Sequence, residues 1–376
     1  MQELDRSDLE DLIRGCSVLG TGGGGSPTAG MAALHRVLDR GKKIRMVSLD
    51  DVPNGATVAT PYMVGSVSPD EQTSSGESDG WETLGLKALD GLEEHLGQQC
   101  FAVLPTEIGG YNTAVALCIA AERKVPVVDA DPAGRSVPGV EHTSFAIYDV
   151  PITPMSLATR MGDVLIVRAV ADDFRAEAIA RALAVVSGNV IAVADHPVDG
   201  QTLKRSVIPG TLSQALAIGR AIRLALTGGR DPVDKVLRAG EGYLLFSGVV
   251  SESNWHLEGG FTFGEIVIQG KGRFAGHSYQ IQYKNEHYAS WLDEAIDVTV
   301  PDLICLLCSR TGEAITNPNC RKGADVAVVG FSAPDVWRSP KGLRLLGPRA
   351  FGLDVEYRPV SEGNHGRARG YSPECR

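Results

Sequence analysis

Two short segments of the sequence gather side chains that could carry out acid–base chemistry. They span residues 107–112 (EIGGYN) and 129–135 (DADPAGR). The first segment follows an apolar run at 101–104, and the second begins at the end of an apolar run at 125–130. Each run predicts a buried strand. A predicted helix joins the two strands, and in such a right-handed unit the carboxyl ends of neighbouring strands meet at one edge of the sheet. Because open α/β sheets bind ligands at that edge, we expect both segments to line one crevice.

Three carboxylates in this predicted crevice, Glu107, Asp129 and Asp131, are the candidate catalytic residues. Crowded carboxylates raise one another's pKa, which produces an acid or base that works near neutral pH. We expect Asn112 to hydrogen-bond a substrate amide, and Arg135 either to clamp an acidic substituent or to neutralise the carboxylates. The same residues could form an ion-pair network that only caps the sheet edge. We favour the catalytic interpretation because shifted carboxylates are enriched in functional sites.

A run of glycines at residues 20–27 (GTGGGGSP) is a second candidate site. Consecutive glycines before a predicted helix expose backbone N–H groups that can converge on an anion. A helix rather than a strand precedes the run and no Lys-Ser/Thr pair follows it, so it is neither a Rossmann fingerprint nor a P-loop. It is either a substrate-binding loop or a tight connection between helices. The predicted substrate-binding residues are Gly22, Gly23, Gly24, Gly25, Gly109, Gly110, Asn112, Arg135 and His142.

Metal ligands are not marked by any strong spacing in the sequence. Cys305 and Cys308 form a single CxxC pair inside an apolar run, which indicates buried thiols rather than a zinc site. The sequence predicts no cofactor, and leaves open a divalent metal held by Asp129, Asp131 and a histidine. A polar triplet at 284–286 (KNE) interrupts a β-rich stretch and is a further candidate site, although a hairpin turn is the favoured interpretation.

Composition narrows the class of protein. The 376-residue chain contains 44 glycines and carries a formal net charge of −10, which argues against a broad nucleic-acid surface. Its seven cysteines are odd in number and scattered, as expected for reduced thiols. The opening MQELDRSDLEDLIRGC is acidic where a secretory peptide is basic, and no stretch approaches the roughly 20 apolar residues of a membrane span. We therefore expect a cytoplasmic protein with no nucleic-acid or membrane partner.

The order of predicted elements indicates an α/β fold. Strands and amphipathic helices alternate first, and glycine-punctuated strands without helices follow beyond residue 240. We predict an amino-terminal α/β domain with a largely parallel sheet at 1–160, with an extension to about 240 left open. The predicted second portion spans 161–360 and ends in a smaller, β-rich carboxy-terminal domain. We expect residues 361–376 to form a mobile tail. The polar segment 68–80 is expected to be either a lid or a solvated loop.

Several motifs occur in an order that resembles one known family. They are LGTGGGGSP, TEIGGYN, VPVVDADPAGRSVP, YKNEH, PDLI, TGEAI and PRAFGLDVEYRPV. Together they are similar to the S-methyl-thiohydantoin desulfurase family, often encoded beside hydantoinase and oxoprolinase subunits. The resemblance extends from about Leu9 to Val360.

This resemblance implies an amino-terminal α/β domain, a β-rich carboxy-terminal domain, and a hydrolase for which water displaces methanethiol or sulfide from a thiohydantoin-type ring to leave a hydantoin. Glu107 or Asp129 would then be the base, with Asp131 tuning its pKa. Alternatives are a hydantoin or lactam-ring hydrolase, a nucleotide-binding protein, or a non-catalytic subunit of a hydantoinase- or oxoprolinase-like complex. The expected partners are a small cyclic substrate, copies of the same chain in a homo-oligomer, and hydantoinase-related subunits.

Overall fold

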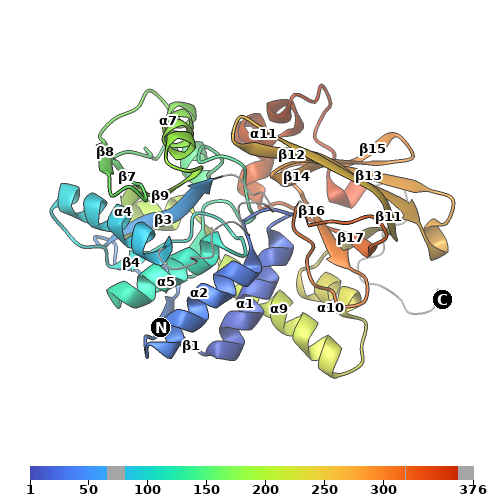
Figure 1. Ribbon diagram of the computed structural model, residues 1–376, viewed down its shortest axis with the longest axis horizontal. Helices are drawn as coiled ribbons and strands as arrows, with labels where there is room; N and C mark the ends of the chain where they lie inside the picture. The colour runs from blue at the N-terminus through green and yellow to red at the C-terminus, as the bar shows by residue number, and fades with distance from the viewer. Residues whose placement is uncertain (66–80, 318, 363–376) are drawn as a thin grey trace.

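The computed structural model describes residues 1–65, 81–317 and 319–362. Two sheets lie side by side, the first with its helices on the left of Figure 1 and the second on the right. The predicted loop at 68–80 and residues 363–376 of the predicted tail lie outside the described residues.

Parallel strands form the centre of the first sheet. Within the described chain the strand order is β1-β2-β5-β4-β3-β9-β7-β8. Neighbours from β2 to β3 pair in parallel, and the outer strands on both sides pair antiparallel, so the predicted α/β class is confirmed. The strands are β1 (Gln2–Leu4), β2 (Ile44–Val47), β3 (Thr57–Gly65), β4 (Ala102–Val103), β5 (Val127–Val128), β7 (Met155–Ala158), β8 (Val164–Val167) and β9 (Val190–Asp199).

Helices cover both faces of this sheet, as the apolar strands predict. On β3, Ala59 and Met63 belong to the core cluster beneath α4 and α5, whereas Tyr62 and Val64 pack with α7. This two-residue alternation is the geometry of a strand buried on both sides. The helices of this half are α1 (Arg6–Leu19), α2 (Pro27–Asp39), α4 (Trp81–Leu96), α5 (Asn112–Arg123), α6 (Ser144–Ile147), α7 (Asp173–Val186), α8 (Gly200–Ser206), α9 (Thr211–Thr227) and α10 (Pro232–Ala239), with the short 3-10 helix η1 (Leu49–Asp51).

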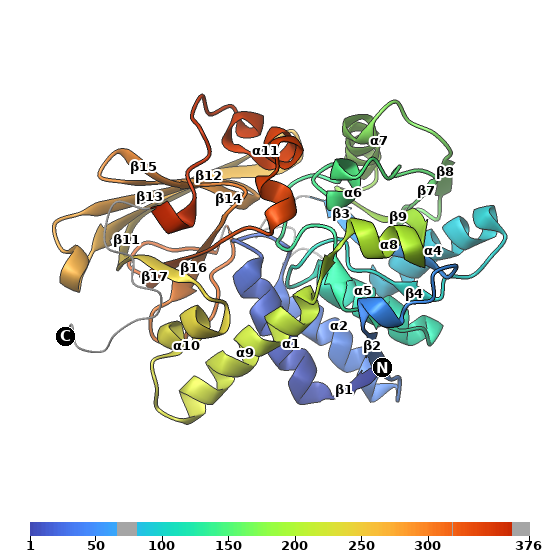
Figure 2. The same cartoon turned by 180° about the vertical axis from the view of Figure 1, so that it is seen from behind.

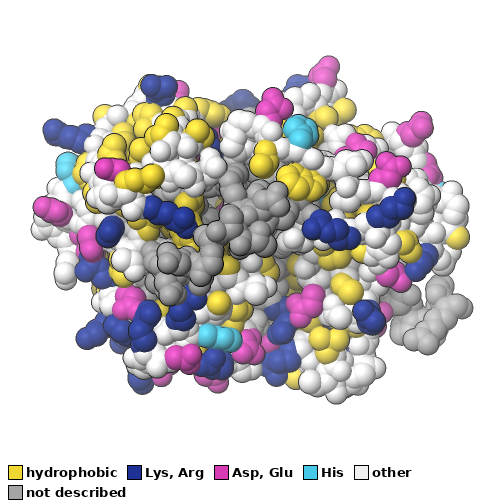
Figure 3. Space-filling view, viewed as in Figure 1, with side chains coloured by type: hydrophobic (Ala, Val, Ile, Leu, Met, Phe, Trp, Pro, Cys, Tyr) yellow, Lys and Arg dark blue, Asp and Glu magenta, His cyan; other side chains and the backbone are white. Residues whose placement is uncertain are grey.

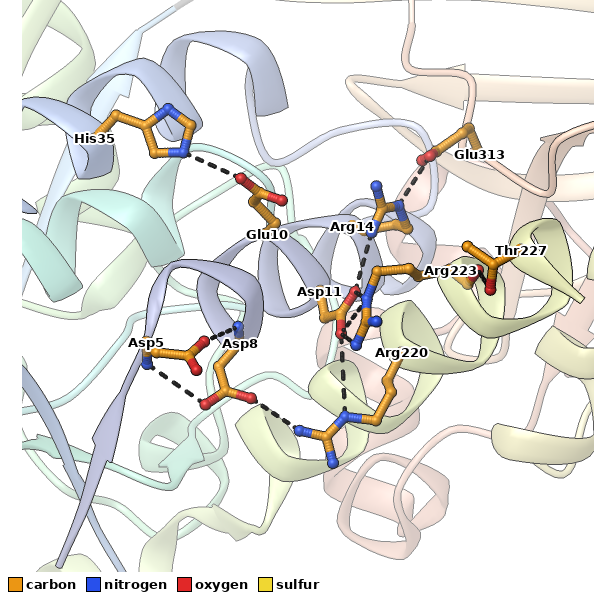
Figure 4. Close-up of polar contacts among 10 residues, drawn as sticks. All are labelled: Asp5, Asp8, Glu10, Asp11, Arg14, His35, Arg220, Arg223, Thr227 and Glu313. Atoms are coloured by element: carbon orange, nitrogen blue, oxygen red, sulfur yellow. Dashed lines mark hydrogen bonds and ion pairs between the residues drawn. The ribbon is translucent and has the colours of Figure 1, made fainter.

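Helices α1 and α9 cross in close contact (Figure 2). A Cβ at Gly15 would lie 1.7 Å from the Ala215 carbonyl oxygen, so the backbones meet where only glycine fits. Beside this contact the buried Asp11 carboxylate accepts hydrogen bonds from Arg14 and Arg223 (Figure 4). Arg14 also donates to Glu313 in the second half at 2.8 Å, which ties α1 to both halves.

The second half is an antiparallel β half-barrel, in agreement with the β-rich region expected beyond residue 240. Its order is β15-β14-β13-β12-β11-β17-β16. The strands are β11 (Tyr243–Glu258), β12 (Phe261–Gly270), β13 (Ser278–Lys284), β14 (Glu286–Leu292), β15 (Ala295–Thr299), β16 (Leu303–Cys308) and β17 (Asp325–Phe331). The helical turns of this half are η2 (Gly272–Phe274), η3 (Asp335–Arg338), α11 (Pro340–Leu346), η4 (Pro348–Phe351) and η5 (Val360–Glu362).

Chain segments from each half cross the seam between them. Strands β7 to β9 complete the first sheet, so that sheet continues past residue 160 as far as Asp199. From the second half, the buried Trp337 donates its indole N–H to the Ala133 carbonyl at 2.7 Å. A two-stranded ribbon of β6 (Ala130–Asp131) and β10 (Ile208–Pro209) lies next to the same loop. The two halves are therefore joined at the carboxyl edge of the parallel strands.

The described helices include none that is both long and apolar enough to cross a membrane. On the face in Figure 3, acidic and basic side chains are interspersed rather than separated by sign. This face therefore lacks the concentrated positive charge by which proteins attract phosphate backbones.

Candidate active site

The glycine loop, residues 20–26, lies at the seam between the halves (Figure 1). It connects α1, which ends at Leu19, to α2, which Ser26 caps through its hydroxyl. Three backbone hydrogen bonds join the loop to later segments of the described chain. Its Thr21 and Gly22 carbonyls accept from the N–H groups of His287 (2.9 Å) and Asn317 (2.7 Å), and the Gly24 carbonyl accepts from Tyr111 (2.8 Å). The loop is thus fixed by both halves at once.

Two segments press against the loop so closely that side chains are excluded from it. A Cβ at Gly24 would lie 2.4 Å from the Gly109 Cα, and a Cβ at Gly23 would lie 1.8 Å from Glu286 Oε1. Gly24 also has a φ of +74°, a conformation that favours glycine. The glycines therefore allow both the segment 107–112 and the β13–β14 hairpin to approach the loop backbone closely.

Glu107 is buried, with 5% of its surface exposed. Asn112 donates to its Oε1 and the Val137 N–H to its Oε2, both at 2.8 Å. Burial raises the pKa of Glu107, while these hydrogen bonds and the positive charge of Arg135 act in the opposite direction. The Val137 contact and an Ile108 N–H bond to the Arg135 carbonyl at 3.2 Å show that the two predicted segments do meet.

Glu286 is the second carboxyl group of the site and comes from the other half. It starts β14 directly after Asn285, whose φ of +57° forms the predicted hairpin turn. Glu286 is 4% exposed, accepts from the Gly24 N–H, and its Oε2 has no hydrogen-bond partner among the described residues. Burial raises the pKa of Glu286 well above its ordinary value, and the negative charge of Glu107 raises it further.

This pair has the properties of an acid and a base. Two groups donate hydrogen bonds to Glu107, and both bonds favour its ionised form. One oxygen of Glu286 has no hydrogen-bond partner among the described residues, and the negative charge of Glu107 disfavours ionisation of Glu286. When the surroundings of two neighbouring carboxyl groups push their pKa values apart, the group with the higher pKa serves as the acid and the other as the base. Of the two groups, Glu286 therefore keeps its proton to the higher pH.

Arg135 is only 1% exposed, and its guanidinium connects the two halves. It donates to the carbonyls of Ser136, Pro301, Asp302 and His287 and to the Thr21 hydroxyl, at 2.9 to 3.2 Å. A guanidinium has five N–H donors, and these five bonds use all of them. In this structure no Arg135 donor is left to clamp a substrate anion.

The two aspartates of the second predicted segment have different surroundings from Glu107. Asp129 accepts from the Ser213 N–H and hydroxyl at the start of α9, so its carboxylate caps a helix. Asp131 is fully buried and accepts from the N–H groups of Ala133 and Gly134. Burial raises the pKa of Asp131 to about 7, and the charge of Glu107 contributes to this rise.

Two buried histidines follow site residues along the chain, His287 after Glu286 and His142 after the segment that ends at Arg135. His287 follows Glu286 and hydrogen-bonds the Ile304 carbonyl through Nδ1 at 2.8 Å; burial lowers its pKa to about 4. His142 is 6% exposed and stacks against Phe351, with Nδ1 lacking a hydrogen-bond partner among described residues. Burial also lowers the pKa of His142 to about 4, so both rings are neutral near pH 7.

The sequence offered the triplet that contains Glu286 as a candidate site, but favoured an ordinary hairpin turn, and Glu286 was not among the predicted site residues. In the structure the hairpin forms, and Glu286, the first residue of β14, also lies against the glycine loop. The one available signal was the YKNEH motif. Across residues 1–65, 81–317 and 319–362, no group of three or more His, Cys, Asp or Glu side chains is arranged to hold a metal ion.

Comparisons with known proteins agree with this architecture. A crystal structure of a protein from Chromobacterium violaceum, solved as a structural-genomics target, superposes with a TM-score of 0.78 at 23% identity, over 96% of this chain and 100% of that chain. At that identity the likeness shows the fold. No curated protein matches the chain.

Two family models together match nearly the whole chain. The S-Me-THD-like N-terminal domain covers residues 7–169 and the S-Me-THD-like C-terminal domain covers residues 171–360. They divide the chain between β8 and α7. The chain therefore belongs to the S-Me-THD-like family, the family of S-methyl-thiohydantoin desulfurase-like proteins.

Proposed function

We propose that this protein is a hydrolase of an S-methyl-thiohydantoin-type ring, in which water displaces methanethiol and leaves a hydantoin. The family name indicates a thiohydantoin-related enzyme. The observation that carries the proposal is a pair of buried, electrostatically coupled carboxyl groups: Glu286 contacts the glycine loop at Gly23, and Glu107 lies two residues before Gly109, which contacts the loop at Gly24. Replacement of a thiolate at an amidine-like carbon needs a base for water and an acid for the ring nitrogen, and the pair supplies both.

In the first step, water adds its oxygen to the ring carbon that bears sulfur. One water proton moves to the Glu107 carboxylate. The electron pair of the carbon–nitrogen double bond moves to the ring nitrogen, which takes the proton of Glu286. The product of this step is a tetrahedral carbon that bears hydroxyl and methylthio groups, beside an ionised Glu286.

In the second step, the hydroxyl proton returns to Glu286 as the carbon–oxygen double bond forms and the carbon–sulfur bond breaks. The departing methanethiolate takes the proton held by Glu107 and leaves as methanethiol. One water is consumed, both carboxyl groups regain their starting states, and no redox partner is required. The orphaned Oε2 of Glu286 is suited to this exchange because no other described residue competes for its proton.

Other predicted site residues position this pair in the proposed mechanism. Asn112 donates to Glu107 and accepts from the Met63 N–H, so both ends of its amide are engaged. Arg135 donates to the hydroxyl of Thr21, within the glycine loop, and to the carbonyl of His287, the residue after Glu286. We assign both as positioning residues.

Release of thiol tests the proposal directly. Purified wild type is mixed with an S-methyl-thiohydantoin, and free thiol and hydantoin are quantified, beside the variants Glu107→Gln and Glu286→Gln. We expect each variant to lose about 10²- to 10⁴-fold in kcat, the usual contribution of a general acid or base. The variant Asp129→Asn tests the other carboxylate that the sequence suggested as a base.

The outcomes separate the alternatives. Thiol release that depends on Asp129 but not on Glu286 would move the chemistry to the other loop. Ring opening of a hydantoin or lactam without thiol release would indicate the alternative hydrolase. Wild-type kcat in both glutamine variants would refute the acid–base assignment, and no turnover of any ring substrate would favour a non-catalytic subunit.

A further inference from the structure

We propose that Arg181, paired with Glu177, is a positioning residue for Glu107, because it holds the backbone segments that supply or orient both hydrogen bonds to that carboxylate. This inference rests on the function proposed above and adds a control on the state of the proposed base. Both residues lie on α7, and their side chains are only 13% and 11% exposed. Desolvation offsets much of the attraction within such a buried ion pair, so stability alone gives little reason for its presence. Neither side chain takes part in the proposed acid–base chemistry.

The first of these segments is 137–140. Glu177 accepts from Arg181 Nε through Oε1 at 2.8 Å and from the Val140 N–H through Oε2 at 3.1 Å. Arg181 also donates to the Pro138 carbonyl at 3.4 Å. The Val137 N–H, which donates to the proposed base at 2.8 Å, immediately precedes Pro138. The ion pair therefore fixes the chain directly beyond one donor of the base.

The second segment is the end of β3. Arg181 donates to the carbonyl of Gly65, the last residue of that strand, at 3.2 Å. Two residues earlier, the Met63 N–H donates to the Asn112 side-chain oxygen at 3.1 Å. The amide nitrogen of Asn112 in turn donates to Glu107 at 2.8 Å. The other donor of the base is therefore oriented by a strand whose end Arg181 holds.

The guanidinium also contacts the second half of the molecule. The hairpin between β11 and β12 reaches α7 from that half (Figure 1), and its Gly260 carbonyl accepts from Arg181 at 3.4 Å. The centre of the Phe261 ring lies 4.4 Å from the guanidinium carbon, a cation–π contact. Strand β12 continues through β13 to β14, which begins with Glu286. One side chain thus ties the support of Glu107 to the sheet that carries its partner.

Loss of Arg181 should weaken the bonds to Glu107 without any change to Glu107 or its donors. Burial raises the pKa of Glu107, and the bonds from Asn112 and Val137 lower it, so weaker bonds should raise it further. The other charged or titratable groups that are coupled to the charge of Glu107 stay unaltered in such a variant; they are Tyr62, Asp131, Arg135 and Glu286. A rise in the pKa of Glu107 therefore reports its two hydrogen bonds.

Thiol release is measured across pH for wild type, Arg181→Met, Arg181→Lys and Arg175→Met, an exposed control on the same helix. For Arg181→Met we expect the acidic limb of kcat to move up by about one pH unit, the effect of losing a hydrogen bond to a charged group. At neutral pH kcat should fall about tenfold with KM changed less than about twofold, as expected for a misplaced base. Arg181→Lys keeps the charge beside Glu177 and should show a smaller shift in the same direction.

Two double variants separate positioning from charge and from a general loosening of the fold. Arg181→Met/Glu177→Gln removes the carboxylate that Arg181→Met leaves unpaired, and it should keep most of the shift because the carbonyls of Pro138 and Gly65 still lack their donor. In the Glu107→Gln background, Arg181→Met should change the residual kcat less than about twofold, since its effect acts through Glu107. A wild-type acidic limb in the first double variant, or a further large loss in the second, would overturn the proposal.

Carbon-13 NMR of protein labelled at its glutamate carboxyl groups gives the pKa of Glu107 without turnover, since Glu107→Gln identifies its signal. If wild type releases no thiol and that pKa is nonetheless higher in Arg181→Met than in wild type, the positioning role stands and the proposed reaction fails. If thiol release depends on Glu107 but the acidic limb is the same in wild type, Arg181→Met and Arg181→Lys, the positioning role is refuted and the reaction stands. If Arg181→Met does not fold, the smaller shift expected for Arg181→Lys decides between these outcomes.

Discussion

The carboxyl group of Glu286 occupies the space that any side chain at position 23 would need. A Cβ at Gly23 would lie 1.8 Å from Glu286 Oε1 and 2.5 Å from its Cδ. Because Glu286 is buried between the glycine loop and the half-barrel, it has little room to withdraw. The loop and the proposed acid are therefore built as one unit.

This contact predicts the effect of a single methyl group. Gly23→Ala should displace Glu286 and lower kcat at least about tenfold, with a loss of about 1–3 kcal/mol in the free energy of unfolding, the usual cost of overpacking. Gly55→Ala is the matched control, since a Cβ there meets nothing within 4 Å. Steady-state thiol release and urea denaturation measure the two effects. Full activity in Gly23→Ala would show that Glu286 is not needed where the structure places it.

The separated pKa values of Glu107 and Glu286 predict a bell-shaped dependence of kcat on pH. Activity should fall at low pH, where Glu107 takes up a proton, and at high pH, where Glu286 loses one, because burial and the charge of Glu107 raise the pKa of Glu286 the further of the two. The residual kcat of Glu286→Gln should lack the decline on the alkaline side. Glu252→Gln, an exposed carboxyl on β11, should keep the whole bell. An alkaline limb that persists in Glu286→Gln would assign it to another group.

Asp131 predicts a pH dependence of stability rather than of catalysis. Its pKa rises on folding from 3.8 to about 7, so between these values the folded protein holds a proton that the unfolded chain has released. The contribution of Asp131 to the free energy of unfolding is therefore largest below pH 3.8. It falls by up to about 4 kcal/mol as the pH rises to about 7. Asp131→Asn can still accept the Ala133 and Gly134 N–H bonds and removes the titration.

Urea denaturation of wild type and Asp131→Asn from pH 4 to pH 8 measures this difference. The free energy of unfolding of the variant, relative to wild type, should grow as the pH rises to about 7 and then level off. Parallel pH profiles for the two proteins would mean that Asp131 titrates near its ordinary pKa in the folded state.

Local sequence patterns were sufficient for the first sheet and for part of the site. Apolar runs at 101–104 and 125–130 with a helix between them predict a parallel βαβ unit, and the contact of Val137 with Glu107 confirms that the loops after these strands meet. The glycine run was correctly placed between two helices. These features depend on periodicity and connection rules that act over short distances along the chain.

The remainder of the site depends on tertiary contacts that no local pattern contains. Glu286 lies far along the chain from Glu107, and its triplet is explained equally well by a turn, so its contact with the glycine loop needed the structure. Asp129 was expected beside Glu107, but strand geometry directs its carboxylate to Ser213. Arg135 was expected to bind an acidic substituent or to neutralise the carboxylates, because of its charge. Its hydrogen-bond partners are instead mainly backbone carbonyls of the second half.

The last prediction concerns Arg135, which could act as a clamp for a substrate anion or as a hydrogen-bond donor that joins the two halves. A lysine could replace the first role but not the second. A clamp for a substrate anion would need mainly the positive charge, so Arg135→Lys would raise KM modestly in a stable protein. The structure instead predicts that lysine, with one nitrogen, leaves several of the carbonyls of Ser136, Pro301, Asp302 and His287 without donors. The free energy of unfolding should then fall by at least about 2 kcal/mol and kcat should fall with it, while KM changes little in the molecules that remain folded. Urea denaturation and thiol release on the same preparation give both numbers. A stable Arg135→Lys protein with a raised KM would restore the role of substrate clamp to Arg135.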